Sequence, residues 1–192
     1  MIVDGVRLFL LAGLIIHKFV WEVLSRRLAS SKDAAPQRRS GLSRVLKGVK
    51  LAILAGLVGQ AVSPEILPIA TAPAALRVLG IALFTLGLVV AILGRVQLGH
   101  NWADIEAAQV LQGQSVVETG IYRYVRHPIY AGDLLLLIGF ELSLNSWLVL
   151  AVAALVPYVV WRALREERML SERLPGYDGY QGRTYRFVPF VV

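Results

Sequence analysis

The chain has no cysteine among its 192 residues. A disulfide framework, a thiolate metal site and a cysteine nucleophile are therefore excluded. Its three histidines, His17, His100 and His127, are far apart and form no HExxH or similar motif, so we expect no metal site. Acidic residues are few, 13 against 20 Lys and Arg. In a hydrophobic chain such a basic excess is typical of membrane topology, and we expect no nucleic-acid partner.

Hydrophobic residues are abundant instead. They make up 56% of the chain, and the mean hydropathy is +0.61, whereas soluble domains are about 45–50% apolar. The length leaves no room for an additional soluble domain of ordinary size. The composition therefore predicts one all-α integral membrane domain over residues 1–192, with about five transmembrane helices.

Residues 1–98 contain three predicted spans. The first, residues 3–24, lacks a small-residue cleavage site and is interpreted as a retained helix rather than a signal peptide. A basic loop, residues 25–50, follows. The second span, residues 51–69, should end or kink at Ser63–Pro64. The third, residues 74–98, carries Gly80, Gly87 and Gly94 at intervals of seven, which predicts a close helix-packing face.

Residues 99–192 form the predicted catalytic half. The apolar run 134–161 would be roughly 42 Å long as one helix, too long for one span without severe tilt. The polar sequence 143–146 inside it predicts a turn, and hence a helical hairpin of spans four and five. The fifth helix should continue out of the membrane over residues 162–172. The tail, residues 174–192, is rich in glycine and tyrosine and predicts a folded cap.

The basic residues predict the orientation. With the amino terminus outside, residues 25–50, residues 99–130, the helix extension 162–172 and the tail all lie in the cytoplasm, and they hold 15 of the 20 Lys and Arg. Two polar clusters at the ends of apolar runs then fall on the same side of the membrane. We therefore expect a multi-pass protein with its site at the cytoplasmic surface.

The first polar cluster is GIYRYVRHPIYAG, residues 120–132. It places Arg123, Arg126, His127 and Tyr130 against the apolar run that begins at Leu134. Ionisable groups at a span entrance usually have a function. The His-Pro pair predicts the start of a helix, whose first amides can bind an anionic group. The ordinary alternative is a purely structural helix start.

The second cluster is RALREE, residues 162–167. Arg162 and Glu166 are four residues apart and share one face of a helix. The ordinary alternative is an exposed ion pair on an interfacial helix, which contributes only a few tenths of a kcal/mol.

Together these clusters resemble a known family. The chain is similar to the isoprenylcysteine carboxyl methyltransferase family, which is related to the phospholipid N-methyltransferases. The similarity lies in the order of its motifs: GIYRYVRHPIYAG, an apolar hairpin, RxxxEE, and a tail of the form YxxYxxxTxRxxP. The resemblance covers residues 98–190 and includes LGHNW at residues 98–102 and the approach at residues 116–120. The chain departs from the family at Ala103, where serine is frequent, and at Leu174-Pro175-Gly176.

The resemblance implies a five-helix enzyme that uses S-adenosylmethionine on the cytoplasmic side, with a lipid-like acceptor that arrives through the bilayer. It assigns Arg162 to the substrate, places Arg162 and Glu166 in catalysis, and leaves His100, Asp133 and Arg186 without a role. The cofactor contacts that it implies are Gln114, Ser115, Val116, Val117, Tyr122, Arg126, His127, Pro128, Ile129, Tyr130, Glu166 and Glu167.

Physical chemistry is consistent with these roles. A carboxylate such as Glu166 suits the ammonium group of the cofactor, and helix-terminus amides with His127 suit its carboxylate. The expected acceptor is a lipophilic carboxylate of the prenylcysteine type, already ionised at neutral pH and oriented by Arg162. The alternatives are a phospholipid amine, which must lose a proton, an NADPH-dependent reductase of the sterol type, and a membrane scaffold without activity.

Overall fold

The computed structural model describes residues 4–29, 41–63, 65–101 and 114–189. Six α-helices and no strand occur in these ranges, with short 3₁₀ turns at Gly99–Asn101 and Gly120–Arg123. The helices are α1 Gly5–Ala29, α2 Gly41–Val62, α3 Ala74–Leu98, α4 Pro128–Ser143, α5 Val149–Arg173 and α6 Tyr177–Gln181. The all-helical prediction is thus confirmed.

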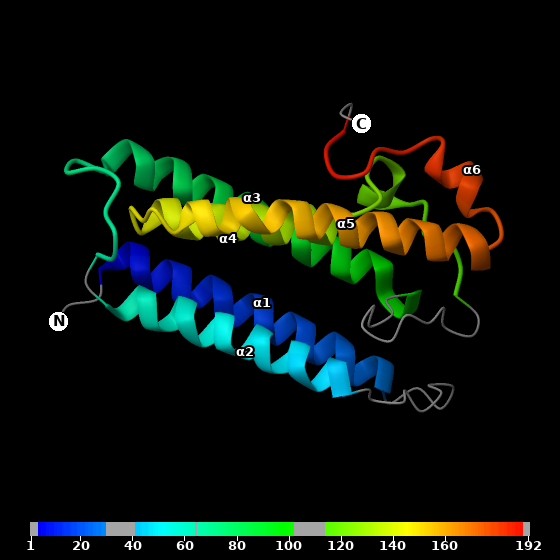
Figure 1. The fold of residues 1–192 in the computed structure, drawn as a ribbon, viewed down its shortest axis with the longest axis horizontal. Helices are drawn as coiled ribbons and strands as arrows, with labels where there is room; N and C mark the ends of the chain where they lie inside the picture. Colours follow the sequence, from blue (N-terminus) through cyan, green and yellow to red (C-terminus); the bar gives the residue numbers. More distant parts are fainter. Residues whose placement is uncertain (1–3, 30–40, 64, 102–113, 190–192) are drawn as a thin grey trace.

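The long helices form two groups (Figure 1). α3, α4 and α5 lie together, and α1 and α2 form an adjacent pair that contacts α3 through α1. The apolar core between the groups includes Leu10, Phe84 and Phe140. α6 and the tail lie beyond the carboxyl half of α5, close to the green segment that precedes α4. One end of the bundle thus carries all the irregular polar structure that the site uses.

α3 and α4 touch through their backbones. A Cβ atom on Gly87 would lie 2.3 Å from the backbone nitrogen of Leu136, and one on Gly139 would lie 2.1 Å from that of Phe84. Gly80 of α3 is equally close to the backbone of Ser143. Small residues permit this approach where helices pack without water. The predicted glycine face of the third helix is confirmed, and its partner is α4.

The structure corrects the predicted second span. α2 begins at Gly41 and ends at Val62, whereas the sequence predicted residues 51–69, and the predicted basic loop 25–50 is helical where it is described outside residues 30–40. Basic side chains do not prevent a helix from extending beyond an apolar segment, so their number alone was misleading. The end near Ser63 was predicted correctly. Arg7 of α1 donates hydrogen bonds to the carbonyl oxygens of Ala61 and Ser63 there.

The third helix and the hairpin agree with the sequence analysis. α3 has the predicted bounds, and α4 and α5 are joined by a turn over residues 144–148. Asn145 adopts a left-handed conformation in this turn, with φ 57°. Its side-chain amide donates to the carbonyl oxygen of Ala70 at 2.8 Å and accepts from the Ala70 amide at 3.0 Å. The hairpin turn is thereby attached to the segment before α3.

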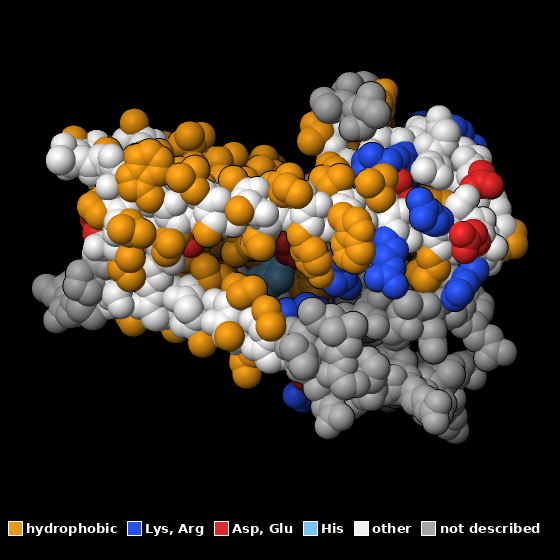
Figure 2. Space-filling model, in the orientation of Figure 1, with side chains coloured by type: hydrophobic (Ala, Val, Ile, Leu, Met, Phe, Trp, Pro, Cys, Tyr) orange, Lys and Arg blue, Asp and Glu red, His pale blue; other side chains and the backbone are white. Residues whose placement is uncertain are grey.

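Two described helical segments, Gly5–Arg27 and Ala74–Leu98, are long and apolar enough to cross a membrane. The apolar part of α2, Gly48–Val62, is shorter. α4 has 16 residues and is therefore about 24 Å long, against about 30 Å of hydrocarbon. Figure 2 shows apolar side chains over most of this face and Lys and Arg gathered towards one end. The count of five spans and the orientation stay predictions.

Candidate active site

The tail runs beside the segment that leads into α4. Val125 and Tyr185 form a parallel bridge, in which the Tyr185 amide donates to the carbonyl oxygen of Tyr124 at 2.9 Å. The amides of Arg126 and His127 donate to the carbonyl oxygens of Tyr185 and Arg186 at 2.8 and 3.0 Å. These three bonds fix the backbone immediately before Pro128, the first residue of α4.

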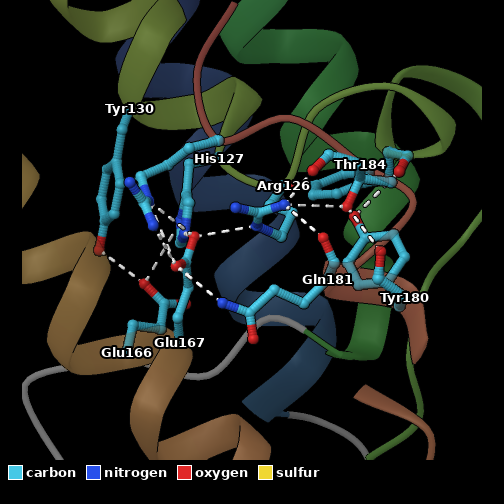
Figure 3. A network of polar contacts seen from close by, with 10 residues as sticks. Arg126, His127, Tyr130, Glu166, Glu167, Tyr180, Gln181 and Thr184 are labelled. Carbon is cyan, nitrogen blue, oxygen red and sulfur yellow. Dashed lines mark hydrogen bonds and ion pairs between the residues drawn. The ribbon is translucent and has the colours of Figure 1, made fainter. Parts of the chain in front are cut away.

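Glu167 is the centre of a charged network at this end of the bundle (Figure 3). Its carboxylate accepts from Nε of Arg126 at 2.9 Å, lies 3.1 Å from Nε2 of His127, and accepts from Nη2 of Arg186 at 3.0 Å. Burial raises the pKa of Glu167, but the hydrogen bonds from His127, Arg186 and Arg126 outweigh it and hold that pKa well below its usual range. Glu167 therefore stays ionised and fastens three segments together.

Glu166 has the opposite environment. Its Oε2 accepts from the hydroxyl of Tyr130 at 3.0 Å and lies 3.9 Å from Nδ1 of His127. Burial raises the pKa of Glu166, and the favourable effects of His127, Tyr130 and Arg162 offset only part of that rise. Two adjacent carboxyls thus have pKa values displaced in opposite directions, as in sites where neighbouring acids have separate roles.

A pocket opens beside Glu166 and encloses about 890 Å³, its solvent-open part included. Small-molecule and cofactor pockets are about 300–1,000 Å³. Of the predicted cofactor residues, ten line it: Gln114, Ser115, Val116, Val117, Tyr122, Arg126, His127, Ile129, Tyr130 and Glu166. Pro128 and Glu167 do not line it. Pro128 begins α4, and Glu167 holds Arg126 and His127 from behind.

Sequence analysis missed part of the wall. The additional lining residues are Leu98, Asn101, Met169, Leu170, Leu174, Tyr177 and Tyr180. Asn101 and the two tyrosines lie in the LGHNW and YxxY motifs, so the signal was present but carried no assigned role. Oδ1 of Asn101 accepts from the Ser115 amide at 2.8 Å. The Tyr180 hydroxyl donates to the carbonyl oxygen of Tyr122 at 2.9 Å.

Arg162 lies beside the pocket rather than in its wall. In the described part of the chain no ion pair joins it to Glu166, so the ordinary alternative of an exposed ion pair within α5 gains no support. Its Nη1 donates to the Tyr158 hydroxyl at 3.4 Å, and its guanidinium also interacts with Tyr130. Arg162 thus contacts one tyrosine of its own helix and one of α4.

Two of the three residues left without a role have partners in the structure. Arg186 belongs to the Glu167 network. Asp133 lies 3.0 Å from Nε2 of His17. Ala103 lies outside the described residues, and the side chain of His100 is not described.

The chain matches the family model described as phospholipid methyltransferase over residues 75–175. The chain belongs to the phospholipid methyltransferase family. The matched stretch contains α3, α4 and α5, and with them His127, Tyr130 and Glu166. The NADPH-dependent reductase and the scaffold that the sequence left open gain no support from this match.

Two curated relatives are similar to the chain. The nickel-cobalt-cadmium resistance protein NccN of Alcaligenes xylosoxydans xylosoxydans is 29% identical over 113 residues, 56% of this chain and 50% of the relative. The cobalt-zinc-cadmium resistance protein CzcN of Cupriavidus metallidurans is 31% identical over 109 residues, 56% of this chain and 49% of the relative. The chain therefore spans about half the length of the curated relatives it matches.

Proposed function

We propose that the protein is an S-adenosylmethionine-dependent methyltransferase that acts on a lipophilic acceptor in the membrane. The observation that carries the proposal is the buried carboxyl of Glu166, which is oriented by Tyr130 and lines a pocket of cofactor size. Membership of the phospholipid methyltransferase family supports the same reaction class.

The pocket residues fit this cofactor chemically. Glu166 is a partner for the ammonium group of the methionine moiety, and the pairing would favour the ionised form that burial disfavours. The first amides of α4, with His127, are donors for the carboxylate. When bound, S-adenosylmethionine supplies a methyl group on a sulfonium, and the protein contributes chiefly by holding the acceptor in line and excluding water.

Arg162 supports an acceptor with an anionic group. It is adjacent to Tyr130, and no carboxylate among the described residues forms an ion pair with it. The group that it orients is either a prenylcysteine-type carboxylate, as in the isoprenylcysteine carboxyl methyltransferases, or the phosphate of a phospholipid amine. A carboxylate is the nucleophile itself and needs no base, whereas a protonated amine must first lose a proton.

Calorimetric titration of the purified protein in lipid nanodiscs tests the proposal, with NADPH as the control ligand. We expect micromolar binding of S-adenosylmethionine, a loss of at least tenfold in affinity for Glu166→Gln because an ammonium contact disappears, and no change for Glu172→Gln. Glu172 lies on the exposed surface of α5, outside the pocket wall. Binding of NADPH in place of S-adenosylmethionine would refute the proposal in favour of a reductase.

The methyl acceptor is then identified with a labelled methyl group. A farnesylated cysteine carboxylate and phosphatidylethanolamine are offered in separate nanodisc preparations. Transfer to either supports a methyltransferase, and the product distinguishes an ester from a secondary amine. Absence of transfer to both, in protein that binds the cofactor, contradicts the proposed acceptor classes.

A further inference from the structure

His17 and Asp133 form a polar pair between α1 and α4. Nε2 of His17 lies 3.0 Å from Oδ1 of Asp133, and the imidazole stacks on Trp21 with ring centroids 4.1 Å apart. His17 falls within Gly5–Arg27, one of the segments apolar enough to cross a membrane. An ionisable pair is costly in such a place and usually marks a functional site.

The pair lies next to the pocket. Asp133 follows Tyr130 by three residues on α4, so the two side chains are neighbours on one helix face, with Cβ atoms about 5–6 Å apart. Gly132, between them in sequence, faces the backbone of α3 instead. Tyr130 lines the pocket and binds Glu166. Asp133 is therefore one helical turn from the pocket, in the direction of the membrane interior.

Both members of the pair are accessible. The side chains of His17 and Asp133 are 25% and 41% exposed, whereas that of His127 is 5% exposed. Figure 2 shows a hollow in the apolar surface between α5 and the α1–α2 pair, with a histidine side chain at its floor. A lipid headgroup can therefore approach the pair from the side of the bundle.

The arrangement suits removal of a proton. If Nε2 of His17 carries the hydrogen, it donates to the Asp133 carboxylate, and this bond fixes the tautomer and leaves Nδ1 as the acceptor. Within the described ranges no hydrogen bond occupies Nδ1. A carboxylate that orients an imidazole in this way is the common arrangement of a general base.

We propose that His17 is the general base of the reaction, positioned by Asp133, and that the acceptor is consequently a lipid amine. The inference rests on the proposed methyltransferase function and selects between its two acceptor classes. Arg162, which also interacts with Tyr130, then binds the phosphate of the same headgroup. A zwitterionic headgroup thus meets a cation and a proton acceptor next to one tyrosine.

The step balances as follows. The ammonium group of the acceptor gives one proton to Nδ1 of His17. The amine lone pair then forms a bond to the methyl carbon while the carbon–sulfur bond breaks, and the electron pair of that bond remains on sulfur. The products are S-adenosylhomocysteine and a methylated ammonium lipid, and the proton on His17 passes to solvent.

Methyl transfer in nanodiscs tests the proposal with His17→Gln, Asp133→Asn and the neighbouring Lys18→Gln as control. For His17→Gln we expect a loss of about 100-fold in transfer to phosphatidylethanolamine, since general-base catalysis contributes about 10²–10⁴. Asp133→Asn should show a smaller loss and Lys18→Gln none. Affinity for S-adenosylmethionine, which also reports folding, should change less than twofold in all three.

A second acceptor distinguishes whether His17 acts as a general base or only as a structural residue. A phospholipid with a fluorinated ethylamine headgroup is largely unprotonated at the assay pH, so its methylation should be nearly equal in the wild type and His17→Gln. An equal loss with both lipids would overturn the proposal. Transfer to the farnesylated carboxylate alone would overturn it too, yet leave the methyltransferase function standing. Failure of the wild type to bind S-adenosylmethionine would reject both together.

Discussion

At the scale of single residues, Glu166 lines the pocket, whereas Glu167 stabilises the segments around it. Neighbours in sequence, they point to different surroundings, one to the pocket and one to the cations that close it. Their opposite pKa displacements state the same difference in electrostatic terms. Substitution of each by glutamine keeps the size and removes the charge, so the pair offers its own internal comparison.

Glu167→Gln should destabilise the protein. The change leaves Arg126, whose side chain is 8% exposed, without its anionic partner, and breaking a buried pair in this way costs about 3–5 kcal/mol. A lower thermal-unfolding midpoint in detergent measures the effect. Glu172→Gln, at an exposed position, should stay within about 0.5 kcal/mol. A midpoint unchanged in Glu167→Gln would show that the network contributes little.

Glu166→Gln should unfold no more easily at neutral pH than the wild type, although it loses the cofactor. A carboxyl whose pKa is raised by folding prefers its neutral form in the folded state, so its ionisation at pH 7 opposes folding, and an uncharged replacement relieves that cost. The same thermal-unfolding measurement checks this. A marked decrease in the midpoint would assign Glu166 a structural role instead.

Acid should weaken the Glu167 network. Because folding lowers the pKa of Glu167, its stabilisation is fully present above the unfolded value near 4.5 and declines as the pH falls from there towards the much lower folded value. Urea unfolding at pH 6 and pH 3.5 should therefore show a larger acid loss for the wild type than for Glu167→Gln. Parallel pH curves for the two proteins would contradict the assignment.

The sequence predicted the role of a residue well only where its interaction partners are close to it along the chain. His127 and Pro128 begin a helix as their order indicates. Arg162 contacts Tyr158, one turn earlier in the same helix. Glu166 contacts Tyr130 of α4, a partner that spacing within α5 does not indicate. The His17–Asp133 contact joins positions 116 residues apart, and no periodicity in the sequence points to it.

At the scale of helices, the α3–α4 interface is the most constrained. Gly139→Ala would place a methyl group against the backbone of Phe84 and should destabilise the protein by about 1–3 kcal/mol, as overpacking does. Gly56→Ala in α2 has open space around its Cβ position and should stabilise its helix by about 0.5–1 kcal/mol. Thermal unfolding of both variants compares them. Equal midpoints would mean that the backbones separate easily.

The sequence predicted helix bounds correctly where an apolar run ends at clear turn-forming or polar residues. α3 was predicted to the residue, and the hairpin turn was placed correctly by three polar residues, Ser143, Asn145 and Ser146, in an apolar run. α2 was placed too late because its first ten residues include Arg44, Lys47 and Lys50. The amino acids of a positively charged loop and of a helix that emerges from a membrane are the same, so composition alone does not separate them.

At the scale of the whole molecule, the absence of cysteine permits a direct test of topology. Thr71→Cys, in the loop before α3, should react with a membrane-impermeant maleimide in intact cells, because the predicted orientation places that loop outside. Glu172→Cys, near the carboxyl end of α5, should react only after permeabilisation. Both positions are exposed. The reverse pattern would invert the predicted orientation and move the pocket to the outer surface.

The bridge between Val125 and Tyr185 also implies an order of events during synthesis of the chain, because the tail is made after the helices that it contacts. A ribosome releases the helices first, and the pocket has its full wall only after residue 180 has emerged. The contact between Arg186 and Glu167 forms only after six further residues, up to Arg186, have been synthesised. A nascent chain that stalls before that point carries helices able to enter a bilayer but lacks the Arg186 contact of Glu167. Synthesis of the tail thus completes the pocket wall and the Glu167 network after all the long helices have been made.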